Sequence, residues 1–363
     1  MTNTDTSASL AVASTSKTLQ GEPKGRTGLK RMLLGRDAIM IYLLLATIVL
    51  FALFLPRFAS PVTVGFLLLD VIPVLLIAMP MTLIVITGEI DLSVASIAGL
   101  TSASLGVMWA AGIEMGVAIA LAIVIGILAG AFNGVLVSFV GLPSLAVTIG
   151  TLALFRGLAL VVIGDNAVAD FPPGFTAFFT SKLGATGIPT VMIGVIAIVV
   201  VFGVILHFTP FGRGLYAIGY SKEAAHFVGI DVLKSKFWLY VASGGVSALA
   251  GVYWTLRYSS ARSDNASGLE LTVVAAVLLG GVSIFGGKGS IPGVFAGVLL
   301  IGTINYALRL GRVSEVVLII VTGALLIVSV VAPSIGAAIR KWAHERRIRR
   351  ELPRTSGSGI TGA

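Results

Sequence analysis

Residues 115–139 have the sequence MGVAIALAIVIGILAGAFNGVLVSF, a run of 25 residues without a charged side chain. A helix needs roughly 20 predominantly apolar residues to cross the hydrocarbon core of a bilayer. As a single helix, this run is long enough to span a membrane. It also lacks the polar face that a helix on the surface of a soluble domain turns towards water. The run therefore predicts a transmembrane helix.

The composition of the whole chain extends this prediction. Of its 363 residues, 56% are hydrophobic and 11% are charged, whereas soluble domains average roughly 25% charged residues. Such a small number of charged side chains cannot cover the surface of a soluble protein of this size. No Cys is present, and His207, His226 and His344 lie far apart, which excludes disulfides, thiolate nucleophiles and metal sites built from Cys or clustered His.

Nine further apolar runs resemble the first, so we predict ten transmembrane helices. Their expected ranges are 38–55, 62–86, 94–111, 115–139, 143–164, 188–208, 237–257, 270–286, 290–308 and 313–333. The second contains Asp70, Pro73 and Pro80, and neighbouring helices have to satisfy the backbone groups that the prolines leave free. The expected architecture is an all-α polytopic membrane protein in three parts. These are a disordered basic cytoplasmic arm (1–37), a transmembrane domain (38–335) and a basic cytoplasmic tail (336–363).

The basic residues predict the orientation of these helices. With the N-terminus in the cytoplasm, 18 of the 25 Lys and Arg residues fall on the cytoplasmic side, six fall outside, and Arg156 lies within a span. This distribution follows the positive-inside rule. An even number of spans places both termini in the cytoplasm, with the basic tail next to a membrane helix. Anionic lipid is then its nearest polyanion, so we expect lipid contact rather than nucleic-acid binding.

Two connections are long, and long loops in a compact protein usually contact something. One covers 165–187 on the outer side and contains Pro172, Pro173 and several Phe residues. The other covers 209–236 on the cytoplasmic side. The sequence therefore predicts one partner on each side of the membrane.

The cytoplasmic connection contains the signals of a short helix. Ser221 is a suitable N-cap, and Glu223, Ala224 and Ala225 follow it. Gly229 is placed to end the helix. The pattern E-A-A, three residues, then G resembles the coupling helix of ABC importer permeases, which fits a cleft on an ATPase subunit in that family. An ordinary amphipathic loop helix is the alternative interpretation.

A second motif narrows the resemblance. Residues 87–96, TGEIDLSVAS, resemble the G-G-I-D-L-S-V-G-S stretch of sugar permeases of the ribose, xylose and arabinose type. Residues 141–159, residues 277–297 and the pair Asn133-Gly134 extend the likeness through nearly all ten spans. The sequence departs from the family at Glu89, where a second Gly is usual, and at Ala95. A carboxylate at position 89 is expected to alter the substrate preference of the pathway.

Ionisable groups within membrane spans are candidates for function. Asp91 has two possible roles, a cap for the third span assisted by Ser93, or a contact with sugar. Arg156 needs a carboxylate or backbone carbonyls as partners. The other members of this group are Asp70, Glu89 and Glu315.

Glycines four residues apart predict close contact between helices. Gly126, Gly130 and Gly134 form two such pairs in one span, and Gly293 with Gly297 forms another. Packing is the favoured role of these glycines over ligand contact. Asn133 lies among them and is expected to bond across helices rather than to touch substrate.

The glycine-rich stretch 280–290, GGVSIFGGKGS, does not match a phosphate-binding loop. The spacing before Lys288 differs, and Gly289 stands where a Ser or Thr would hold Mg²⁺. No catalytic constellation or metal-ligand spacing is present either. We therefore expect no catalytic residue, metal site or cofactor on this chain.

The family resemblance implies a permease subunit that carries a monosaccharide across the bacterial inner membrane. It implies a second permease chain, the same or different, a periplasmic sugar-binding protein, and a cytoplasmic ATPase that binds ATP and Mg²⁺. Residues 255–281 and 170–175 look most like rhamnose-type permeases, with autoinducer-2 importers next. The few charged groups suit a neutral cargo.

A secondary transporter driven by an ion gradient is the rival interpretation. Asp70, Glu89 and Asp91 would then serve as coupling sites in interrupted helices. The combination of the E-A-A pattern with the sugar-permease motifs speaks against it. An integral-membrane enzyme is a third possibility, but the chain has no catalytic constellation to support it.

Overall fold

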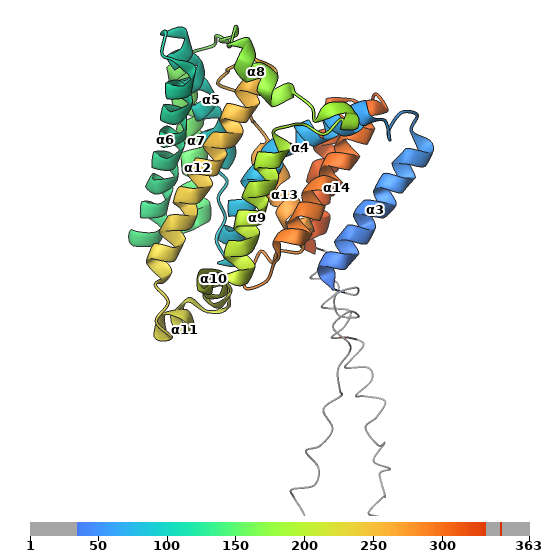
Figure 1. Ribbon diagram of the computed structural model, residues 1–363. Helices are drawn as coiled ribbons and strands as arrows, with labels where there is room; N and C mark the ends of the chain where they lie inside the picture. The colour runs from blue at the N-terminus through green and yellow to red at the C-terminus, as the bar shows by residue number, and fades with distance from the viewer. Residues whose placement is uncertain (1–34, 332–341, 343–363) are drawn as a thin grey trace, which may run out of the picture.

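The computed structural model describes residues 35–331 and Trp342, and these form a bundle of helices (Figure 1). Within the described ranges, extended structure is limited to two isolated bridges, Val168 with Ala261 and Lys182 with Pro189. The predicted all-α class is therefore confirmed. The predicted tail lies outside the described residues apart from Trp342, and so does the predicted arm except for Gly35 to Asp37, where the first helix already begins.

Six helices of the described chain are long and apolar enough to cross a membrane. They are α3 (Arg36–Phe54), α4 (Pro61–Ile86), α6 (Met115–Gly134, continued by a π-helical turn, Val135–Phe139), α7 (Ser144–Ile163), α12 (Val232–Tyr258) and α14 (Ile291–Leu310). A seventh span is formed if α9 (Met192–Phe208) is counted with α10 (Pro210–Tyr220), which is bent from it by 68°. Shorter apolar helices are α5 (Val94–Ala110), α13 (Leu269–Leu279) and Glu315–Val331.

Each of the ten predicted spans thus has a helix, but several boundaries were wrong. The eighth was expected to reach residue 286, whereas α13 ends at Leu279. Gly281 adopts a φ of 91°, and the N–H of Val282 returns to the carbonyl of Val277, which is how a helix ends at a glycine. The helix predicted at 237–257 starts earlier, because the Asp231 side chain caps it by accepting from the Lys234 N–H.

The core lies around α4, which runs unbroken through Pro73 and Pro80 and is buried over most of its second half. It packs against α9, α12, α13 and α14. By contrast, α3 lies at the edge of the bundle beside α14 and exposes most of its apolar side chains (Figure 1). Apolar side chains that face outward suit contact with lipid chains. The backbone N–H and C=O groups of each spanning helix are hydrogen-bonded within the helix, as the bilayer interior requires.

The predicted glycines lie where helices meet. A Cβ on Gly126 or Gly130 would collide with the backbone of α12 at Gly244, and one on Gly134 would press on Phe237. On α14, a Cβ on Gly293 or Gly297 would meet the backbone of α13 at the Gly280 or Ala276 carbonyl. These glycines allow the helix backbones to approach closely.

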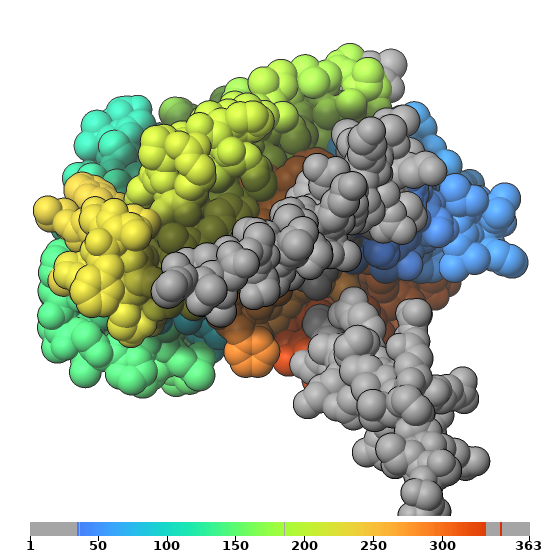
Figure 2. Space-filling view, turned by 90° about the horizontal axis from the view of Figure 1, so that it is seen from below, coloured from blue at the N-terminus to red at the C-terminus, as the bar shows by residue number. Residues whose placement is uncertain are grey.

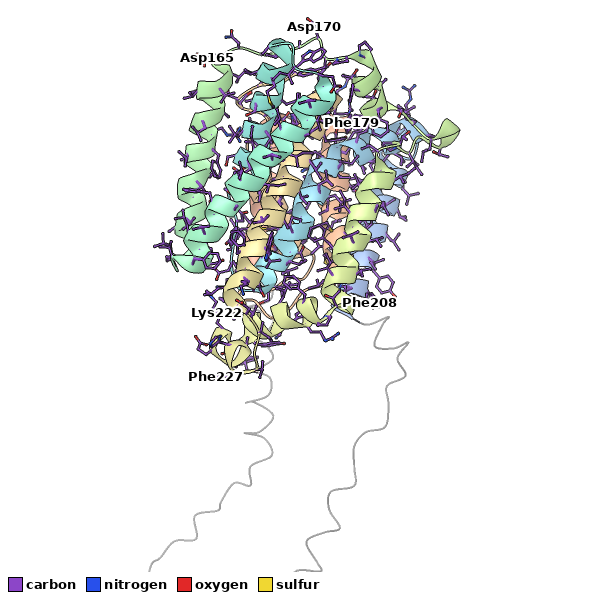
Figure 3. The ribbon with its side chains drawn as sticks, turned by 60° about the vertical axis from the view of Figure 1, so that its left-hand side comes forward. Asp165, Asp170, Phe179, Phe208, Lys222 and Phe227 are labelled. Carbon is purple, nitrogen blue, oxygen red and sulfur yellow. The ribbon has the colours of Figure 1, made fainter. Side chains whose placement is uncertain are left out.

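The two long connections lie at opposite ends of the bundle. Helices α10 and α11 (Lys222–Phe227) lie at one end, named here the α11 end, and α8 (Pro173–Thr180) lies at the other, the α8 end (Figure 1). Figure 3 shows Lys222 and Phe227 at the first end and Asp165 and Asp170 at the second. The sequence had not predicted α8 or α10.

Candidate functional site

The E-A-A pattern forms a short, tightly bounded helix, α11. Ser221 caps its start by accepting a hydrogen bond from the Ala224 N–H at 3.1 Å. At its end, Gly229 has a φ of 84°, the Gly229 N–H bonds to the His226 carbonyl at 2.9 Å, and the Ile230 N–H bonds to the Ala225 carbonyl at 3.0 Å. Both ends of this six-residue helix are therefore capped. The caps matter because intrinsic helix propensity alone does not stabilise so short a helix.

One side of α11 faces the body of the protein and the other faces outward. Ala225 is buried, whereas Phe227 and Val228 are 88% and 74% exposed. Glu223 also points outward, and its own backbone N–H together with the Ser221 hydroxyl lowers the pKa of its carboxyl. The helix thus offers a carboxylate and two large apolar side chains at the surface.

Helix α10 packs against α11. Thr209 caps it by accepting from the Gly212 N–H at 3.1 Å, and Pro210 occupies its first turn. Leu215 and Ile218 are buried against the bundle. The Tyr216 hydroxyl donates to the Gly289 carbonyl at 2.7 Å, which fixes α10 against the loop between α13 and α14.

The break between α4 and α5, residues 87–93, lies at the same end. Its Glu89 is buried and uses one carboxylate oxygen, Oε1, to accept from two lysines. Lys222 of α11 is 2.8 Å away and Lys236 of α12 is 2.5 Å away. The carboxylate that departs from the family pattern is therefore bound to α11 and α12 through ion pairs.

Asp91 in the same break is fully buried and its oxygens are occupied by protein donors. Oδ1 accepts from the N–H and the hydroxyl of Ser93 at 3.0 and 2.6 Å. Oδ2 accepts from the Ser243 hydroxyl of α12 at 2.9 Å. Asp91 satisfies a free N–H at the start of α5, whereas the Ser93 side chain makes no cap bond of its own.

Further bonds join this break to α6 and α7. The Asn133 side-chain amide of α6 donates to the Ser93 hydroxyl at 2.7 Å, so Asn133 bonds across helices. The Ile90 N–H donates to the Ser144 hydroxyl at 3.3 Å, and the Thr148 hydroxyl donates to the Ile90 carbonyl at 3.3 Å. Residues 87–93 therefore contact α6, α7, α11 and α12.

The remaining candidates lie away from this cluster. Arg156 of α7 donates to the backbone carbonyls of Ser263 and Asn265 at 2.7 and 2.9 Å, so carbonyls rather than a carboxylate are its partners. Asp70 pairs with Arg309 at 3.2 Å, and Arg309 lies 3.6 Å from Glu315. The structure does not bring Arg156 together with Glu89 or Asp91.

The lysine partners of Glu89 were missed by sequence reasoning. Lys222 and Lys236 had been counted only as positive charges of a cytoplasmic loop. The sequence did contain one signal, because a carboxylate buried in an apolar segment needs a compensating cation. That requirement does not identify which of the several lysines supplies the cation. No group of His, Asp and Glu in the described residues could hold a metal ion.

A bundle of long apolar helices with a short capped helix projecting from one end is the architecture of a polytopic membrane protein. A family model described as the permease component of branched-chain amino acid transport systems matches residues 63–330, and the chain belongs to this family. The predicted permease class is thereby confirmed, and the chain is a transport subunit rather than an enzyme.

Curated relatives cover nearly the whole chain. "Autoinducer 2 import system permease protein LsrD" of Photorhabdus temperata is 34% identical over 322 residues, 86% of this chain and 96% of that protein. The proteins of the same name from Klebsiella pneumoniae and Yersinia pseudotuberculosis are each 34% identical, over 86% and 87% of this chain and 95% and 97% of their own lengths. No solved structure matches this chain.

Proposed function

We propose that this chain is the permease subunit of an ATP-driven importer of the ABC class, which carries a small neutral polyhydroxylated solute across the bacterial inner membrane. The observation that carries the proposal is α11. It is a helix with both ends capped, it carries the E-A-A pattern, and it presents Glu223, Phe227 and Val228 outward from the bundle. Such a projection suits insertion into a partner protein.

The partner of α11 in this proposal is a cytoplasmic ATPase subunit, which binds ATP and Mg²⁺. A periplasmic sugar-binding protein docks at the α8 end, and a second permease chain, the same or different, completes the pathway. Both termini and the α11 end then face the cytoplasm, and the α8 end faces the periplasm. The lysines and arginines of the two terminal segments favour this orientation.

The pairing of charged groups supports a neutral cargo. Glu89 is compensated by two lysines, Asp70 is paired with Arg309, and Arg156 is held by carbonyls. A zwitterionic amino acid needs counter-charges in its pathway, and these groups are already committed to partners. A polyhydroxylated solute needs only hydroxyl and amide partners.

Two cargo classes follow from the sequence, rhamnose and autoinducer-2. The names of the curated relatives favour the second. Uptake of labelled autoinducer-2 and labelled rhamnose by cells that express the whole transporter tests this choice. Labelled leucine is measured as well, because the family description names branched-chain amino acids. Saturable uptake of autoinducer-2 that excess rhamnose does not inhibit is the expected result. Uptake of leucine alone would overturn the neutral-cargo proposal.

Glu223→Lys is the test of coupling. It reverses the exposed charge of α11 but leaves the Ser221 cap and the Gly229 end in place, so membrane insertion and the bundle are expected to persist. We expect copurification of the ATPase and cargo-dependent ATP hydrolysis to fall at least tenfold. Lys234→Met, at an exposed lysine on the first turn of α12, is the matched control and is expected to change neither.

The same preparation tests the ion-coupled alternative. In proteoliposomes with the binding protein and the ATPase, transport is expected to require ATP on the side of the membrane where the ATPase lies. A protonophore is expected to leave it unchanged. Accumulation of solute by the purified chain alone under a proton gradient would overturn the proposal. Full coupling in Glu223→Lys would remove α11 from its proposed role.

A further inference from the structure

The cluster of Glu89, Lys222 and Lys236 lies at the α11 end, and the proposed function gives it no part in coupling. Both lysines bond to the same oxygen, Oε1, at 2.8 and 2.5 Å. The side chains of Glu89 and Lys236 are each 9% exposed, whereas that of Lys222 is 49% exposed. One carboxylate thus has a buried cation and a half-exposed cation as partners.

This asymmetry allows one of the two ion pairs to open by itself. Lys236 lies on α12, which is packed into the bundle, and it keeps Glu89 compensated in either state. When Lys222 leaves, its ammonium group enters water, so no buried charge remains unpaired. The Lys222 pair is therefore expected to break and reform more easily than the buried Lys236 pair.

The surroundings of α11 leave room for such a movement. A cleft of about 790 Å³ lies between α11 and the segment that joins α6 to α7, and Glu89, Lys222 and Lys236 line it. From the joining segment, Val137, Ser138 and residues 141–143 line it. Figure 2 shows this face, with the yellow residues of α11 beside the green end of α6. Apart from Ala225, which is buried, the residues of α11 are exposed.

On the other side of Glu89, the chain leads directly to residues that hold four helices together. Ile90 bonds to Ser144 and Thr148 of α7, and Asp91 bonds to Ser243 of α12. Asn133 of α6 reaches the same break through Ser93. A displacement of Glu89 would therefore move the start of α5 and change its contacts with α6, α7 and α12.

We propose that Lys222 is a positioning residue for coupling, whose ion pair with Glu89 transmits the movement of α11 to residues 87–93. The inference rests on the proposed function, in which α11 binds the ATPase. Lys222 exists in two states, bound to Glu89 or released to water, and a partner that moves α11 selects between them. Helices α6, α7 and α12 respond because the break is bonded to each of them.

The experiment uses the complete transporter in lipid nanodiscs and measures the ratio of cargo-stimulated to basal ATP hydrolysis. Lys222→Met removes the ion pair and is expected to lower this ratio about tenfold, within the range of coupling energies between sites. Lys222→Arg keeps the charge and is expected to retain the ratio within twofold. Lys234→Met, which removes an exposed pair with Asp231, is the matched control and leaves the ratio unchanged.

The outcomes separate this inference from the proposed function. If Glu223→Lys abolishes ATPase binding but Lys222→Met keeps the ratio within twofold of wild type, α11 is the docking helix and the inference about Lys222 is wrong. If ATPase binding survives Glu223→Lys, both proposals fail. Should Lys222→Met not assemble, Lys222→Gln decides, because it removes the charge, keeps a polar side chain at this half-exposed position and leaves the buried Glu89–Lys236 pair in place. A ratio lowered about tenfold supports the ion pair, and an assembled complex with a ratio within twofold of wild type refutes it.

Discussion

The short helices within the two long connections of this permease are held by different kinds of interaction. At the α11 end, Thr209, Ser221 and Asp231 each cap a helix by accepting from a backbone N–H three residues later, at 3.1, 3.1 and 3.0 Å. At the α8 end, α8 begins without a side-chain cap. Its Phe179 instead packs against Tyr253, with ring centroids 5.8 Å apart.

The difference has a consequence for how each end responds to a partner. Hydrogen bonds and ion pairs depend on direction, so a displaced helix at the α11 end breaks or keeps specific bonds. Apolar contacts are not directional, so α8 can shift against the bundle while it keeps most of its contact. The α11 end is suited to transmit a movement, and the α8 end is suited to adapt to a surface.

The largest effect is expected when the charge that anchors the α11 end is removed. Glu89→Gln leaves Lys236 buried without a carboxylate and is expected to lower the free energy of unfolding by about 3 kcal/mol. Lys222→Met removes only the half-exposed partner and is expected to lower it by less than about 1 kcal/mol. Unfolding in detergent, followed by Trp fluorescence, gives both values.

A double variant checks the cause of that loss. Glu89→Gln with Lys236→Met removes the buried charge together with its partner, and replacing a buried pair by apolar groups is often close to neutral. We expect it to regain most of the stability that Glu89→Gln loses. Equal losses in the single and the double variant would show that the carboxylate acts through something other than Lys236.

These long-range pairs mark the limit of what the sequence predicted. Ser221 and Gly229 were found because a cap and a glycine end act on neighbours within a few residues. Glu89 and its lysines are 133 and 147 residues apart in the chain. The packing of α12 against α4 brings Lys236 to Glu89, and the packing of α10 against α4 and α11 brings Lys222 there. The pairing follows from the tertiary structure, so no local pattern could show it.

Two local errors have physical reasons as well. Residues 280–286 continue the apolar run of α13 with Val282, Ile284 and Phe285, and this hid the end of the helix at the paired glycines. Residues 210–220 contain three glycines, so their intrinsic preference for helix is low. Burial of Leu215 and Ile218 against the bundle overrides that preference and forms α10.

The α8 end offers the next largest effect. Phe179 is half-buried and packs against Tyr253 and both main apolar clusters, and Phe179→Ala is expected to lower the free energy of unfolding by about 2 kcal/mol. Phe179→Leu is expected to lose less than half as much, because an apolar contact tolerates a change of shape. The same unfolding assay applies, with Phe208→Ala, at the 78% exposed last residue of α9, as the control. An equal loss in Phe179→Leu and Phe179→Ala would mean that this end depends on a specific geometry after all.

The smallest effect concerns charged caps, which occur at both ends. The Lys234 N–H lowers the pKa of Asp231 below its ordinary 3.8 at the α11 end, and the Gly116 and Val117 N–H groups lower the pKa of Glu114 below its ordinary 4.5 at the start of α6. A carboxyl with a lower pKa in the folded state stabilises the fold above its unfolded pKa. This contribution is lost as the pH falls through the pKa of the folded state.

Asp231→Asn and Glu114→Gln keep a side-chain acceptor but cannot titrate. In each case the unfolding midpoint of the wild type is expected to exceed that of the variant at pH 7, and the difference is expected to vanish as the pH falls through the lowered folded-state pKa of the carboxyl. A difference that persists unchanged in acid would show that these two caps act through their hydrogen bonds rather than through their charge.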